Sequence, residues 1–187
     1  SLQVEADSSL NLSINKHQKT FEDAAMQIWD WAEVGYLETQ SSKLLQQQLV
    51  TAGFEVTNGV AGIPTAFVAT WRSGNGGPTV GILAEYDALP GITQNRNPLR
   101  DVIDHKAAGH ACGHHLFGTG SVAAAIATKM WMQQSGQVGE LRLYGTPAEE
   151  GGAGKVYMVR DGLFDDVDAV LHWHPSDANS ADARSSL

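Results

Sequence analysis

Apolar residues recur at intervals of three and four in two segments near the N-terminus, the spacing that places them on one face of a helix. The first segment runs from residue 16 to about residue 34, and the second from about residue 41 to residue 52. Gly35 and Gly53 follow these segments, as is typical of residues that end a helix. A third helix is predicted over about 115–134, where small residues permit close packing against a sheet.

Short runs of apolar residues between these helices predict strands. We place the strands at 54–57, 66–71, 80–85, 140–145 and 168–174, and a short helix near 155–161. The glycine-rich turn at 73–78 predicts a hairpin-like connection between the second and third strands, and residues 87–111 are predicted to form a long loop. Because strands and helices alternate after residue 80, we expect an α/β fold with a mostly parallel sheet flanked by helices.

Composition and charge narrow the classes of partner. A net charge of −9 argues against nucleic acid, because that binding needs a basic face that replaces counterions. No apolar run approaches the length that spans a bilayer, so we expect no membrane association. The chain begins at Ser1 without a methionine, so the compartment depends on whether a leader was removed; we expect the cytoplasm, with the periplasm as the alternative. Residues 1–15 are expected to form an N-terminal arm.

The segment from His110 to His115 contains the only cysteine, Cys112, and three of the seven histidines. Thiolate and imidazole bind zinc and similar metals well, and Cys112 and His114 lie just before a predicted helix, whose N-terminus favours the thiolate. Two other interpretations stay open. Cys112 could be a buried apolar cysteine among surface histidines, or a nucleophile with His110 or His115 as its base.

Two further polar motifs follow predicted strands. Glu149 and Glu150 are adjacent in a glycine-rich loop, where a cation could neutralise one carboxylate while the other acts as a general base; a solvated acidic turn is the alternative. His172 and His174 lie two apart in the last predicted strand and would therefore share a face. Their alternative is a histidine pair of the core.

Glu85 and Asp87 lie at the end of the third predicted strand. Together with the cysteine, glutamate and histidine motifs above, they lie beyond the carboxyl ends of the strands, where ligands bind in open α/β sheets. A carboxylate at Glu85 or Asp87 could orient a ligating imidazole, although an ordinary strand-terminating acid is equally compatible. The strong donors form a mixed set of sulfur, nitrogen and oxygen that suits zinc or manganese, and also cobalt or nickel, when two ions share a site. The donors are Cys112, His114, Glu150 and His174, and Glu149 remains as the base. Such a site is suited to amide hydrolysis.

Four segments resemble one known family in the same order along the chain. They are GILAEYDALPG at 81–91, GHACGH at 109–114, TPAEEGG at 146–152 and HWHP at 172–175. Together they resemble the amidohydrolase branch of the aminoacylase and carboxypeptidase-type metallopeptidases. The resemblance extends from about residue 16 to the end of the chain, and it implies a catalytic domain like that of the dinuclear zinc peptidases.

The resemblance also implies a role for each matching residue. Cys112 would bridge two divalent metal ions, and His114, Glu150 and a histidine of the last strand would be further ligands. We prefer His174 for that last ligand, with His172 as the alternate. Glu149 would be the general base, and Asp87 would support the ligands from behind. Many relatives have histidine where this chain has Glu85, so we place Glu85 in a supporting role as well.

Family members continue into a lid and dimerisation domain and a last metal-ligating histidine, so residues 16–187 correspond to the N-terminal part of a truncated catalytic domain. We therefore expect a full-length enzyme that uses a metal-activated water to cleave an N-acyl or aminobenzoyl amide of an amino acid, a small-molecule substrate. The enzyme would be a homodimer or would pair with a related subunit, and this chain alone would be inactive. The alternatives are a non-catalytic metal-binding subunit that needs the missing region, and a cysteine hydrolase.

Overall fold

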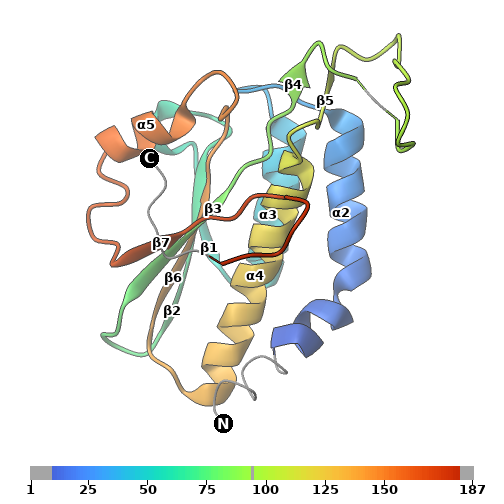
Figure 1. The fold of residues 1–187 in the computed structure, drawn as a ribbon. Helices are drawn as coiled ribbons and strands as arrows, with labels where there is room; N and C mark the ends of the chain where they lie inside the picture. The colour runs from blue at the N-terminus through green and yellow to red at the C-terminus, as the bar shows by residue number, and fades with distance from the viewer. Residues whose placement is uncertain (1–9, 94, 182–187) are drawn as a thin grey trace.

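A computed structural model describes residues 10–93 and 95–181 and shows a five-stranded sheet with helices on both faces (Figure 1). The helices are α2 (Gln18–Trp31), α3 (Thr39–Thr51), η1 (Val60–Gly62), α4 (His114–Ser135) and α5 (Gly154–Arg160). The strands of the sheet are β1 (Glu55–Asn58), β2 (Phe67–Ser73), β3 (Thr79–Ala84), β6 (Gly139–Gly145) and β7 (Ala169–Leu171). Within the described residues, no helix has the length and apolar content needed to cross a membrane.

The strands follow the order β1-β2-β6-β3-β7. Pairing is antiparallel from β1 through β2 to β6, and parallel from β6 through β3 to β7. The expected α/β fold with a helix-flanked sheet is confirmed, and parallel pairing is confined to one half of the sheet. The predicted hairpin between β2 and β3 is wrong, because β6 lies between these two strands and pairs with both.

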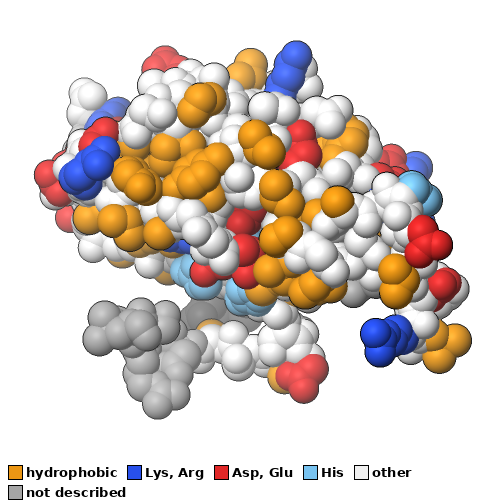
Figure 2. Space-filling model, turned by 90° about the horizontal axis from the view of Figure 1, so that it is seen from above, with side chains coloured by type: hydrophobic (Ala, Val, Ile, Leu, Met, Phe, Trp, Pro, Cys, Tyr) orange, Lys and Arg blue, Asp and Glu red, His pale blue; other side chains and the backbone are white. Residues whose placement is uncertain are grey.

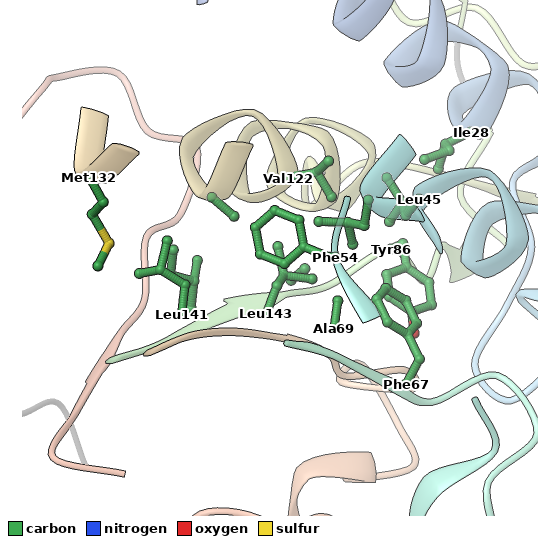
Figure 3. Close-up of a cluster of buried hydrophobic side chains, with 14 residues drawn as sticks. Ile28, Leu45, Phe54, Phe67, Ala69, Tyr86, Val122, Met132, Leu141 and Leu143 are labelled. Atoms are coloured by element: carbon green, nitrogen blue, oxygen red, sulfur yellow. The ribbon is translucent and has the colours of Figure 1, made fainter. Parts of the chain in front are cut away.

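The core consists of two apolar layers, one on each face of the sheet. The larger layer lies between the sheet and helices α2, α3 and α4, and Figure 3 shows Phe54, Phe67 and Leu143 within it. The smaller layer lies under α5 and contains Tyr144 and Met158. Alternation along β6 explains both layers, because Leu143 faces the first layer and its neighbour Tyr144 faces the second.

Several boundaries differ from the prediction. The long loop at 87–111 contains a short antiparallel pair of strands, β4 (Leu89–Pro90) and β5 (Ala108–Gly109). The last strand ends at Leu171 instead of continuing to residue 174, so its pleat does not set the directions of the two histidines. Residues 1–9 of the expected N-terminal arm lie outside the described residues, and residues 10–16 are helical.

The connections place the ends of β3 and β6 beside each other. Strand β3 leads through α4, on one face, to its parallel neighbour β6, whereas β6 leads through α5, on the opposite face, to β7 on the other side of β3. Neighbouring strands whose connections leave over opposite faces open a crevice at their carboxyl ends, where α/β proteins bind ligands. The loops at 85–88 and 146–153 follow the carboxyl ends of β3 and β6, and α4 begins beside them (Figure 1).

Candidate metal centre

Asp87 joins the three segments that form the centre. Its Oδ1 lies 2.8 Å from Nδ1 of His114, the first residue of α4, and both side chains are fully buried. Its other oxygen, Oδ2, accepts the backbone N–H of Glu150 at 2.9 Å. Asp87 therefore fixes the ring of His114 and the loop after β6 relative to the end of β3, which is how a supporting carboxylate orients a metal-binding imidazole.

The remaining nitrogen of His114, Nε2, faces three carboxylates. It lies 3.0 Å from Glu85 Oε2, 3.8 Å from Glu150 Oε1 and 3.9 Å from Glu149 Oε2. Among the buried polar atoms of the described residues, His114 Nε2 and Glu150 Oε1 both lack a hydrogen-bond partner. A buried polar atom without a partner is costly, so these two atoms favour a cation between them. Burial lowers the pKa of His114, but Asp87 and Glu85 raise it more, and the net pKa lies above the usual value.

The two glutamates of the loop differ in exposure. The side chain of Glu149 is 44% exposed, and that of Glu150 is 18% exposed. A general base must reach the substrate and exchange protons, whereas a ligand must be held toward the metal. The exposed fractions are consistent with Glu149 as the base and Glu150 as a ligand.

Cys112 lies close to His114 and to His174. Its Sγ is 3.3 Å from His174 Nε2, and donor atoms of Cys112, His114 and His174 all lie within 4.8 Å of one another. A second group, Glu85, His114 and Glu149, meets the same criterion. Because both groups contain His114, they form one cluster with sulfur, nitrogen and oxygen donors, a set suited to zinc and neighbouring metals. Figure 2 shows histidine side chains beside acidic ones on this end of the molecule.

The neighbouring charges oppose a reactive thiolate at Cys112. Burial, together with the carboxylates of Glu150, Glu149 and Glu85, raises the pKa of the Cys112 thiol to about 12. A nucleophilic cysteine needs a lowered pKa. The two histidines considered as its base make other contacts: His110 Nε2 lies 3.1 Å from the backbone oxygen of Ile28, and His115 packs against Trp29. Among the described residues, the imidazole that contacts Cys112 Sγ is that of His174, and neither His110 nor His115 makes this contact.

The final segment is docked on α4 by Trp173, which lies between the two histidines. The indole N–H of Trp173 donates to Ser121 Oγ at 3.0 Å, in a space that a side chain at Gly120 would close. The rings of His172 and His174 both lie against Phe117. His174 reaches Cys112, whereas His172 Nε2 lies 3.7 Å from Glu85 Oε1. The structure thus brings both candidate histidines to the cluster, with His174 at the thiol.

Glu85 has a partner that the sequence did not indicate. Its carboxylate is 2% exposed and forms an ion pair through Oε1 with Lys155 of α5. This cation offsets the charge of Glu85, and only Oε2 faces His114. Lys155 lies in a short helix on the opposite face of the sheet, so no spacing in the sequence marks it. Glu38 is a second buried acid near the site that the sequence did not indicate.

Comparison with known proteins identifies relatives along most of the chain. The sequence model of "Peptidase family M20/M25/M40" matches residues 81–184. One of the subunits of the p-aminobenzoyl-glutamate hydrolase of Escherichia coli (strain K12) is 47% identical over 164 residues, which are 87% of this chain and 34% of that protein. Hippurate hydrolase of Campylobacter jejuni is 34% identical over 159 residues, which are 84% of this chain and 39% of that protein. The chain thus spans little more than a third of the length of these relatives.

Solved structures share the fold. The Bacillus subtilis YxeP protein, described as a dinuclear metal binding peptidase of the M20 family, superposes with a TM-score of 0.71 at 22% identity, covering 87% of this chain and 44% of that one. An aminobenzoyl-glutamate utilization protein from Klebsiella pneumoniae superposes with a TM-score of 0.62 at 20% identity, covering 87% and 45%. The resemblance drawn from the four motifs, which within the family points to the aminobenzoyl-glutamate utilisation proteins, is confirmed by the sequence comparison.

Proposed function

The chain belongs to the peptidase family M20/M25/M40, and on this premise we propose that it provides the metal-binding half of an enzyme that hydrolyses amides of N-acyl or aminobenzoyl amino acids. The observation that carries the proposal is the buried Nε2 of His114, which makes no hydrogen bond, lies 3.0 Å from Glu85 Oε2 and also faces the carboxylates of Glu149 and Glu150. The names of the relatives support the substrate class, since they act on aminobenzoyl-glutamate and hippurate.

Cys112, His114, Glu150 and His174 would hold two divalent ions, zinc or manganese and less favourably cobalt or nickel, with His172 as the alternate to His174. When bound, such ions supply Lewis acidity that polarises the amide carbonyl and lowers the pKa of water. Bound cations would also offset the neighbouring carboxylates, which together with burial raise the thiol pKa of Cys112.

Residues of the chain itself carry out the proton transfers and orient the ligands. Glu149 takes a proton from the water that attacks the amide carbon, and it returns this proton to the nitrogen as the carbon–nitrogen bond breaks. Asp87 keeps His114 in the tautomer and orientation that direct Nε2 toward the cluster. Glu85, compensated by Lys155, adds negative charge on the Nε2 side of His114, the side that faces the cluster.

We propose that sequence outside this chain completes the centre with a further histidine and a lid, and that the enzyme forms a homodimer or pairs with a related subunit. The name of the Escherichia coli relative, which describes it as one subunit of its hydrolase, supports pairing.

Hydrolysis of p-aminobenzoyl-glutamate by the natural-length protein tests the function. We expect turnover that a chelator abolishes and added zinc or manganese restores. Glu149→Gln should lower kcat by about 10²–10⁴-fold and keep the metal content, whereas the neighbouring Glu150→Gln should lose metal as well. Full turnover in Glu149→Gln would remove this residue from its role, and absence of turnover with every metal would favour a non-catalytic binding subunit.

A further inference from the structure

Glu38 is a buried acid that the chemistry described above does not use. Its side chain is 0% exposed, and it lies immediately before α3. Oε1 accepts the backbone N–H of Ala148 at 2.8 Å, and Oε2 accepts the hydroxyl of Thr65 at 3.0 Å. A charged side chain that is wholly buried is costly unless its oxygens are hydrogen-bonded. Both oxygens of Glu38 are thus hydrogen-bonded, and one of these contacts ends on the residue before Glu149.

Ala148 has an unusual backbone conformation for a residue with a side chain. Its φ is 57°, in the left-handed region that favours glycine. The conformation turns the chain sharply where it leaves the segment after β6, and Glu149 and Glu150 follow at once. The direction of both carboxylates therefore depends on what holds Ala148 in this conformation.

The segment that contains Glu38 contacts the loop at two further points. Tyr36 donates a hydrogen bond from its hydroxyl to the backbone oxygen of Gly152, at the far end of the loop. Gly35 packs so closely on Ala148 that a Cβ at this position would lie 2.9 Å from the Ala148 Cβ. Segment 35–38 thus contacts the loop at its first turn and at its last, and the two glutamates lie between these contacts.

We propose that Glu38 is a positioning residue for the metal centre: by accepting the Ala148 N–H, it holds the left-handed turn that directs Glu150 toward the cluster and Glu149 toward the substrate. This inference rests on the roles proposed for those two glutamates. A hydrogen bond to a charged acceptor is stronger than one between neutral groups, which explains a carboxylate at this position. The acceptor contacts neither substrate nor metal, so its effect passes through the backbone.

Two substitutions and a matched control separate positioning from general stability. Glu38→Ala removes the acceptor, whereas Glu38→Gln keeps a carbonyl oxygen that can accept the Ala148 N–H. Glu33→Ala is the control, because Glu33 accepts hydrogen bonds from the start of the same helix, at Gln40 and Ser41. Two quantities are measured on the natural-length protein. The first is hydrogen–deuterium exchange of the backbone amides of residues 146–152, and the second is the dissociation constant for Zn²⁺, obtained by competition with a chelator.

We expect faster exchange at 146–152 in Glu38→Ala than in the wild type, and a Zn²⁺ affinity and kcat lower by about 10–100-fold, as for other residues that orient ligands from behind. Glu38→Gln should restore most of the protection from exchange and most of the Zn²⁺ affinity. Glu33→Ala should lower stability without changing exchange at 146–152 or Zn²⁺ affinity. If Glu38→Ala does not fold, Thr65→Val loosens the same carboxylate and should shift exchange in the same direction.

Unchanged exchange and Zn²⁺ affinity in Glu38→Ala would overturn the inference, as would equal effects of Glu33→Ala. Failure of the proposed function gives a different pattern. If the protein hydrolyses no amide, exchange at 146–152 still responds to Glu38→Ala when Glu38 holds the turn, because exchange needs neither substrate nor metal.

Discussion

Replacing Gly118 by alanine tests how closely α4 packs against the end of β3. A Cβ at Gly118 would lie 2.7 Å from the backbone oxygen of Glu85 and 3.1 Å from Leu45 Cδ1. The first distance is shorter than a van der Waals contact, and its partner is backbone. That backbone leads directly to Asp87, so it cannot move without shifting the residue that orients His114.

Two opposing effects set the size of the change. Alanine inside a helix is favoured over glycine by about 1 kcal/mol, whereas overpacking a core costs about 1–3 kcal/mol. The upper part of that range applies at Gly118, because a backbone atom cannot rotate away as a side chain can. We therefore expect Gly118→Ala to lower the free energy of unfolding by about 1–2 kcal/mol, and each kcal/mol to lower Tm by about 2–4 °C.

Urea and thermal denaturation of the metal-free protein measure this loss, with Gly120→Ala as the matched control in the same helix. A Cβ at Gly120 would lie 2.6 Å from the indole of Trp173, a residue that is 40% exposed and can swing outward. Gly120→Ala should therefore lower stability less than Gly118→Ala does. A Gly118→Ala protein as stable as the wild type would refute the close packing described for α4.

Three other perturbations have expected outcomes. Burial lowers the pKa of His110 and His115 to about 4, so the unfolded chain binds more protons than the folded chain between pH 6.5 and 4. The free energy of unfolding of the metal-free protein should therefore fall by up to about 3 kcal/mol per histidine as the pH falls through this window. A urea midpoint that is equal at pH 7 and pH 5 would contradict this. Lys155→Met leaves the buried Glu85 uncompensated and should lower the free energy of unfolding by about 3 kcal/mol. Thermal denaturation should show recovery when Glu85→Gln is added, and an unchanged Tm in the single variant would contradict the pairing. Gly120→Ala should weaken Zn²⁺ binding by moving the segment that carries both candidate histidines, and chelator competition that finds wild-type affinity would count against the docking of this segment.

The helices were predicted well from sequence because each has an apolar stripe that its own residues define. Helix α3 was expected at 41–52 and spans Thr39–Thr51, and α4 was expected at 115–134 and spans His114–Ser135. Strand pairing was harder, because a turn sequence indicates a reversal of the chain without indicating its partner. The turn at 73–78 does reverse the chain, but β6, more than sixty residues later, occupies the position between β2 and β3.

The site was predictable to the extent that its residues cluster in motifs at strand ends. The motifs at the strand ends predict that Cys112, His114, Glu149 and Glu150 converge, and the structure places donor atoms of these segments around His114. The preference for His174 over His172 came from the resemblance, because the strand pattern placed both on one face, and the strand itself ends earlier than expected. Lys155 and Glu38 could not be found from sequence, because each acts through one tertiary contact that leaves no local pattern.

The central claim is that Cys112 is a ligand in a metal centre built around His114, and Co²⁺ absorption tests it most directly. We predict that natural-length protein titrated with Co²⁺ develops a thiolate-to-cobalt charge-transfer band in the near ultraviolet, because a bound cation stabilises the thiolate. Cys112→Ser should lose this band. Bound Co²⁺ with no such band in the wild type, or with the same spectrum in Cys112→Ser, would contradict the account.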